Sequence, residues 1–229
     1  MNDARAGILG RIRERLDRTP EAETAARQAV ADRLAGRRRG TQPARIDLDR
    51  AGLLALFVEK SEAVDATVDR VASADQVPDA VARYLRGLNL PAEAAIAPHA
   101  DLDAMPWAGS TLALERRAAK GSDRVGIARA FAGVAETGTL MMASGAQSPA
   151  TLNFLPEVHV VVLAESEVTG GYEDAWQRLR DAGRGLGKDL PRTVNLITGT
   201  SRTGDIEQII QKGVHGPKRL HIVLVRDGA

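Results

Sequence analysis

The apolar positions near the N-terminus follow a helical period. Between residues 8 and 16 they recur every three or four positions, which places them on one face of a helix that ends near Thr19. Pro20 suits the first turn of a second, alanine-rich helix that runs to about Gly36. We therefore predict an antiparallel helical pair within an N-terminal helical extension, residues 1–42.

Beyond this extension, apolar runs of helical period alternate with short β-branched runs. This alternation predicts an α/β fold with a layered, mostly parallel sheet and helices on both faces, over residues 43–229. One expected helix has an apolar face made of Leu53, Leu54, Phe57 and Val58, and the others span residues 77–88, 172–179 and 206–212. The expected strands are residues 63–72, 94–97, 125–130, 134–143, 158–163, 193–197 and 220–225.

Residues 193–225 form the pattern most suggestive of a ligand site, because a strand, a glycine-bearing turn, a helix, a second turn and a strand follow one another. The first turn begins at Gly199 and contains Ser201, Arg202 and Thr203. Two hydroxyls, a guanidinium group and a helix N-terminus would then meet at the carboxyl end of a strand and bind an anion. The alternative is ordinary helix capping, with Asp205 complementing the helix dipole.

The second turn places His215 between Gly213 and Gly216. The ordinary pKa of histidine lies near neutrality, so this side chain is a candidate to polarise or protonate a bound oxygen. A histidine in a tight glycine turn serves equally well to hold the loop. His99 and Trp107 are further candidates, since both follow the strand at residues 94–97.

Glu136 is the most unusual polar residue of the central region, because it interrupts an apolar run that resumes after Thr137, Gly138 and Thr139. A buried glutamate needs a partner such as Arg202 or backbone N–H groups, and would then be a candidate acid, base or nucleophile. A hairpin turn with a solvated glutamate explains the same pattern. Both interpretations remain open, with residues 137–139 as candidate ligand-binding positions.

Composition excludes several classes of chemistry. The chain has no cysteine, so it holds no disulfide, no thiolate zinc site and no cysteine-bound iron–sulfur cluster. Its four histidines form no short metal-binding pair, and we expect no metal site. The net charge is +1, and the first forty residues carry ten basic against six acidic side chains, which is too small an excess to predict nucleic-acid binding. No apolar stretch approaches the roughly 18 residues of a membrane span, so we expect a cytoplasmic protein.

Four segments together resemble the LUD-domain family, and within it the C-type lactate utilization proteins. They are Glu136-Thr137-Gly138-Thr139, the strand entered through His159, residues 199–207 and residues 213–217. The resemblance implies a fold like that of the NagB, ribose-5-phosphate isomerase and CoA-transferase superfamily. It also implies a part in oxidising L-lactate to pyruvate, together with A-type and B-type partner proteins that carry the iron–sulfur clusters.

Three hypotheses follow. In the first, the chain is a cysteine-free component of an L-lactate utilization system that holds a small carboxylate or phosphate, with Arg202 as a bidentate anchor. In the second, it is an autonomous enzyme, isomerase-like or CoA-transferase-like, acting on a phosphorylated or CoA-linked acid with Glu136 as base or nucleophile. In the third, it senses lactate without contributing to turnover.

Overall fold

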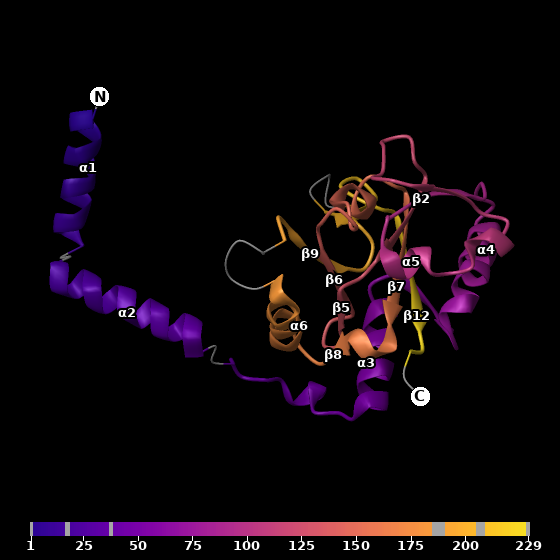
Figure 1. The fold of residues 1–229 in the computed structure, drawn as a ribbon, viewed down its shortest axis with the longest axis horizontal. Helices are drawn as coiled ribbons and strands as arrows, with labels where there is room; N and C mark the ends of the chain where they lie inside the picture. The colour runs from indigo at the N-terminus through magenta and orange to yellow at the C-terminus, as the bar shows by residue number, and fades with distance from the viewer. Residues whose placement is uncertain (1, 17–18, 37–38, 185–190, 205–208, 228–229) are drawn as a thin grey trace. The chain divides into compact units, whose positions relative to one another are not determined.

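The computed structural model describes residues 2–16, 19–36, 39–184, 191–204 and 209–227 (Figure 1). The chain divides into two compact units, Met1–Thr41 and Gln42–Ala229. The first unit consists of helices α1 (Asn2–Arg15) and α2 (Pro20–Gly36), which confirms the two predicted helices. None of the side chains described in α2 is buried, so the packed antiparallel pair predicted from the sequence is not found in this unit.

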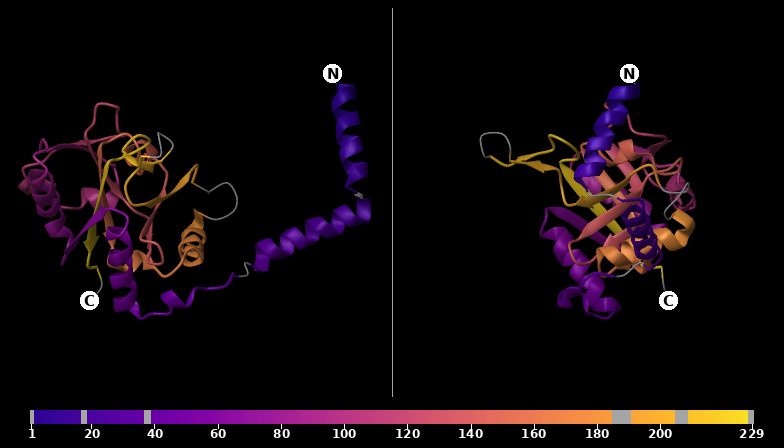
Figure 2. Two further views of the ribbon diagram at one scale, coloured as in Figure 1. Left: turned by 180° about the vertical axis from the view of Figure 1, so that it is seen from behind. Right: turned by 90° about the vertical axis from the view of Figure 1, so that its left-hand side faces the viewer.

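The second unit is built around a six-stranded sheet in which every strand pair is parallel, in the order β1-β12-β7-β4-β2-β3 (Figures 1 and 2). This large sheet, with the helices around it and at the N-terminus, confirms the predicted fold class. Its middle strands are buried on both faces, which explains their continuous apolar sequences. The strands are β1 (Ala66–Val71), β2 (Glu93–Ile96), β3 (Ala113–Arg116), β4 (Val125–Arg129), β7 (Val158–Ala164) and β12 (Arg219–Val225).

A second, four-stranded sheet in the order β8-β5-β6-β9 is formed by the connections that leave β4 and β7. Within it β5 pairs with β8 in parallel, and β6 is antiparallel to both β5 and β9. Met141 contributes to the apolar cluster with helix α6 (Tyr172–Leu179), whereas Leu140 and Met142 belong to the main core. This alternation places the small sheet between α6 and the main core. The strands are β5 (Ala132–Val134), β6 (Thr139–Ala143), β8 (Val168–Thr169) and β9 (Val194–Thr198).

Helix α3 (Arg50–Glu62) of the second unit begins at an ordinary capping residue. The carboxylate of Asp49 accepts a hydrogen bond of 2.8 Å from the backbone N–H of Gly52 and so caps α3. Phe57 on α3 is fully buried, as its apolar face predicts. The α-helices are α3 (Arg50–Glu62), α4 (Val77–Gly87), α5 (Ala100–Asp103) and α6 (Tyr172–Leu179), and short 3₁₀ turns cover residues 44–46, 74–76, 107–109, 150–153 and 165–167.

The helix predicted over residues 206–212 is wrong for residues 209–212, the part of that range that the structure describes. Gln211–Lys212 is strand β11, which pairs antiparallel with β10 (Arg202–Thr203), and Ile209 and Ile210 are not helical. Strand β9 also belongs to the small sheet, not to the sheet that contains β12. Residues 193–225 therefore do not form the expected strand–helix–strand unit. No described helix has the length and apolar character needed to cross a membrane.

Candidate functional site

The order of the large sheet defines a switch point between β2 and β4. After β2 the chain moves to β3 at the sheet edge, whereas after β4 it moves in the opposite direction to β7. Connections that diverge in this way leave a crevice outside the carboxyl ends of the two strands, where open α/β sheets bind ligands. A pocket of about 270 Å³ lies there, lined by His99 after β2, by Arg129 at the end of β4 and by residues 145–148 after β6.

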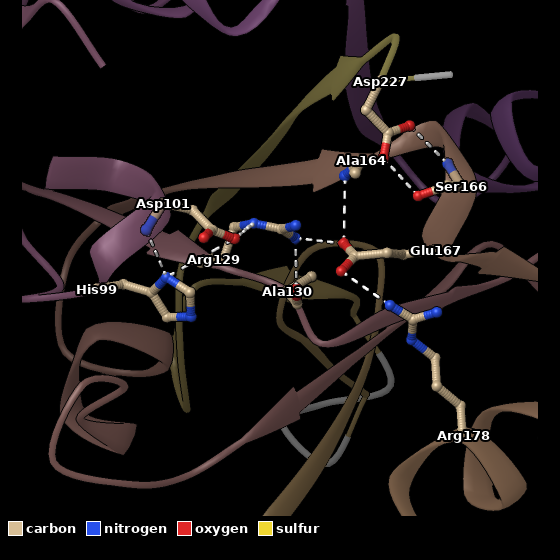
Figure 3. Close-up of polar contacts among 9 residues, drawn as sticks. All are labelled: His99, Asp101, Arg129, Ala130, Ala164, Ser166, Glu167, Arg178 and Asp227. Carbon is tan, nitrogen blue, oxygen red and sulfur yellow. Dashed lines mark hydrogen bonds and ion pairs between the residues drawn. The ribbon is translucent and has the colours of Figure 1, made fainter. Parts of the chain in front are cut away.

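Arg129 is the most buried charged side chain of this pocket, with 8% of its surface exposed. Its Nη1 contacts Oε2 of Glu167 at 2.5 Å and donates to the carbonyl oxygen of Ala130 at 2.6 Å. Its Nε donates to Oδ2 of Asp101 at 3.2 Å (Figure 3). Nη2 makes no hydrogen bond to any described residue, so one edge of a buried guanidinium group keeps donor capacity beside the pocket.

Glu167 joins two arginines. One carboxylate oxygen contacts Arg129, and the other contacts Nη2 of Arg178 on α6 at 3.0 Å (Figure 3). The guanidinium carbon of Arg178 also lies 5.6 Å from the ring centroid of Phe131, within the range of a cation–π contact. Glu167 is 16% exposed and has charged partners on both oxygens, so it is a fixed counter-ion that holds the end of β4 to α6.

Asp227 extends this network beyond β12. It accepts hydrogen bonds from the backbone N–H of Ser166, at 2.9 Å, and from the Ser166 hydroxyl (Figure 3). Burial opposes ionisation of Asp227, but these hydrogen bonds and the positive charge of Arg129 bring its pKa below the usual value. The segment after β12 therefore helps to fix the turn that carries Glu167.

His99 is held in a defined orientation at the start of α5. Its Nδ1 accepts a hydrogen bond of 3.2 Å from the backbone N–H of Asp101, which places the proton of the neutral ring on Nε2. His99 lines the pocket, and the N–H of its neutral ring is on Nε2. Trp107, the other candidate of this loop, is buried and donates from Nε1 to the carbonyl of Leu102, so it has a packing role.

Glu136 lies in the turn of the β5–β6 hairpin, but its side chain is only 14% exposed and so is not the solvated glutamate of the hairpin interpretation. Its partner is Arg45, at 2.5 Å, and not Arg202. The next side chains form a hydroxyl cluster in which Thr139 contacts Thr198 at 2.7 Å, Thr137 at 2.7 Å and the Tyr172 hydroxyl at 3.0 Å. These hydroxyls bind one another and tie β6 to β9 and α6.

Arg202 contacts Asp65 at 3.1 Å, and Lys212 contacts the same oxygen at 2.5 Å. Lys212, followed by Arg202, lowers the pKa of Asp65. Arg202 thus joins the β10–β11 ribbon to the end of α3. The predicted helix N-terminus beside it is not found among the described residues of this segment.

Several of the other predicted residues of these two turns take part in backbone hydrogen bonds, strand pairing or packing. The Ser201 N–H donates to the Pro217 carbonyl, and the Gly213 N–H donates to the Ser201 carbonyl, at 2.9 Å. Gly216 lies close to the Ser201 side chain, and Thr203 pairs with Gln211. His215 is exposed, and Asp205 lies outside the described residues.

The sequence interpretation missed Arg129 and Glu167 as site residues. A charged residue at the end of an almost wholly apolar strand was a usable signal for Arg129, because such a side chain emerges at the ligand-binding edge of a parallel sheet. Glu167 had no such signal. It is 38 positions away in the sequence and meets Arg129 only because β4 and β7 are neighbours.

Fold and site together define an α/β protein with a polar pocket at the switch point of its parallel sheet. Residues 54–225 match the LUD domain family, and the chain belongs to that family. A crystal structure of a DUF162 family protein from Deinococcus radiodurans has the same fold, with a TM-score of 0.58 and 21% identity over 78% of this chain and 99% of that one.

Curated relatives agree with this assignment. Lactate utilization protein C of Exiguobacterium sp. is 33% identical over 121 residues, which are 53% of this chain and 52% of that protein. Lactate utilization protein C of Geobacillus sp. is 32% identical over 103 residues, or 45% of this chain and 42% of that protein. The uncharacterized protein YkgG of Escherichia coli is 31% identical over 104 residues, 45% of each. The chain spans about half the length of these relatives.

Proposed function

We propose that this chain is a component of an L-lactate utilization system and that its pocket beside Arg129 binds a small carboxylate. The relatives named lactate utilization protein C support the first part. The second part rests on one observation, the largely buried Arg129 at the switch point of the sheet. A guanidinium edge suits a carboxylate because two parallel N–H donors match its two oxygens.

The pocket also fits the rest of a small hydroxy or keto acid. Its volume of about 270 Å³ lies just below the range of pockets for drug-sized ligands, which start near 300 Å³. With a carboxylate on Arg129, the oxygen on the neighbouring carbon would accept a hydrogen bond from His99. Ala130, Ala143 and Ala146 leave room for a short apolar group such as a methyl.

The chain itself carries no cysteine, so cysteine-bound iron–sulfur clusters of such a system belong to partner proteins. We infer partners of the A and B types, as the family resemblance implies. In this arrangement the chain binds and orients the acid, and electrons pass through clusters held elsewhere. The expected location is the cytoplasm, where lactate and the reduced partners would meet.

Lactate-dependent reduction of an electron acceptor tests this function. The full chain is mixed with the A-type and B-type proteins of the same genome, and the rate is compared with that of the partners alone. We expect activity only when all three proteins are present. Equal activity without the chain would contradict the proposal and favour the autonomous-enzyme or sensor hypothesis.

Arg129→Lys in the same assay is expected to lower kcat/KM for lactate by about 10–100-fold. Lysine keeps the positive charge but lacks the planar pair of donors, and hydrogen bonds to charged groups are worth about 1.5–3 kcal/mol. Arg124→Lys is the matched control, because Arg124 is exposed and its contact with Glu157 is 3.4 Å. A similar loss in both variants would show that Arg129 has no special role in binding lactate.

A further inference from the structure

The donors of Arg129 are used unequally. Nη1 is committed to Glu167 and to the carbonyl of Ala130. Nε and Nη2 form the lateral edge of the guanidinium group, which can grip both oxygens of a carboxylate at once. Asp101 contacts this edge through one oxygen only, at 3.2 Å from Nε. Asp101 therefore uses only one of the two donors on this edge of the guanidinium group, Nε and not Nη2.

The two carboxylates on Arg129 also differ in how firmly they are held. Glu167 is 16% exposed and contacts Arg129, Arg178 and the backbone N–H of Ala164. Asp101 is 56% exposed, and its carboxylate also lies near the His99 ring, with 3.9 Å between Nδ1 and Oδ2. An exposed carboxylate in a single ion pair costs little to displace, because such pairs contribute about 0–1 kcal/mol.

Resting on the function proposed above, we propose that Asp101 is an internal substitute for the ligand, and that a small monocarboxylate displaces its side chain from the lateral edge of Arg129. The incoming carboxylate makes two hydrogen bonds, to Nε and Nη2, where Asp101 makes one. Glu167 stays in place as the permanent counter-ion. The total charge around Arg129 is unchanged when Asp101 turns to solvent and the ligand enters.

This exchange leaves His99 in position. The ring is oriented by the backbone N–H of Asp101 and not by its carboxylate, so the side chain can leave without releasing the ring. The ligand oxygen next to the carboxylate then meets a histidine that is already oriented. Asp101 therefore acts on affinity and selectivity: a neutral molecule of the same shape gains nothing by replacing it.

Equilibrium binding to the full chain tests the proposal, by titration calorimetry with L-lactate, pyruvate and the neutral analogue lactamide. We expect Asp101→Asn and Asp101→Ala to bind L-lactate or pyruvate about 2–5-fold more tightly than the unmodified chain, because the competing carboxylate is gone. Lactamide affinity is expected to stay unchanged. Arg129→Lys is expected to remove the carboxylate preference in either background.

Asp103→Asn is the matched control, since Asp103 lies on the same short helix and pairs with Arg116. It should leave carboxylate affinity unchanged. The proposal would be overturned if both Asp101 variants bound carboxylates no more tightly than the unmodified chain. It would also be overturned if lactamide gained as much affinity as the carboxylates, or if Asp101→Asn showed no measurable carboxylate binding. Failure of the proposed part in lactate utilization is a separate outcome, which shows as lactate oxidation that does not need the chain.

Discussion

Replacement of Gly138 by alanine is expected to destabilise the second unit by about 2–5 kcal/mol, measured by urea unfolding at neutral pH. Gly138 has a φ of +65°, a left-handed conformation that costs a residue with a Cβ about 1–2 kcal/mol. A Cβ there would also lie within 3.0 Å of backbone atoms of Lys60 and Ser61, which cannot rotate away as a side chain would. Forced overpacking adds about 1–3 kcal/mol.

Gly121→Ala is the control for this substitution. Gly121 also lies in a turn, but its φ is not positive and a Cβ there would meet nothing within 4 Å. We expect a change within about 0.5 kcal/mol at this exposed position. If Gly138→Ala unfolded at the same urea concentration as Gly121→Ala, the close approach of the β5–β6 turn to α3 would be wrong.

Gly199 has the same role on the neighbouring turn. Its φ is +70°, and a Cβ would lie within 3.0 Å of the Val64 carbonyl oxygen. Two glycines of the segments that resemble the LUD-domain family thus bring the turns after β5 and β9 against the end of α3. In both segments the glycine explains packing, whereas the sequence pattern indicated Gly138 and Gly199 as candidate ligand-binding positions.

Much of the fold could be predicted because burial dictates sequence pattern. The continuous apolar runs of β4, β7 and β12 reflect strands covered on both faces, and α3 shows its apolar face clearly. Strand β3 carries no such signal, because most of its four residues are exposed. The allocation of β9 to a second sheet is also invisible in the sequence, because pairing partners are set by tertiary packing.

The helix predicted over residues 206–212 shows how tertiary contacts overrule local preference. Gln211 and Lys212 suit a helix, but in the structure they pair with β10, and Lys212 shares Asp65 with Arg202. The turns at Gly199 and Gly213 were correctly predicted from their glycines, and the structure gives both glycines a positive φ. What failed was the inference from two glycine turns to a helix between them, and with it the predicted helix dipole.

The candidate site was the least predictable part, for a topological reason. His99, Arg129 and Glu167 follow different strands, and only the strand order brings them to one pocket. The sequence interpretation favoured polar residues that are close together in the chain, such as Ser201 and Arg202. A site at a switch point is instead assembled from residues that are far apart in sequence, so single residues at strand ends are the better guide.

His159 is expected to make the chain sensitive to acid, which is the second large effect that the structure predicts. It lies in the central strand β7, in register between Gly126 and Leu220, and is fully buried. Neither ring nitrogen has a hydrogen-bond partner among the described residues. Burial disfavours the charged ring and lowers its pKa from 6.5 to about 3.

The direction of the effect follows from proton uptake. Between pH 6.5 and about 3 the unfolded chain binds a proton at this position and the folded chain does not. Stability therefore falls as the pH falls through this window, by about 1.4 kcal/mol per pH unit for one histidine. His159→Leu should reduce the slope of unfolding free energy against pH by that amount between pH 6 and 4.5, measured by urea unfolding.

A comparison with His221 distinguishes the acid sensitivity of a buried histidine from the effect of removing its packing contacts. Burial lowers its pKa to about 4, but its Nδ1 contacts the Thr67 hydroxyl at 2.8 Å and its ring stacks on Tyr84. Both His159→Leu and His221→Leu should flatten the acid slope. At pH 8 both rings are neutral, and His221→Leu should lower the stability because it removes these contacts. His159→Leu should not lower it, because leucine replaces a ring with two unpaired nitrogens in the core. A large loss for His159→Leu at pH 8 would mean that its ring has a polar partner, and an unchanged acid slope would mean that the ring is protonated in the fold.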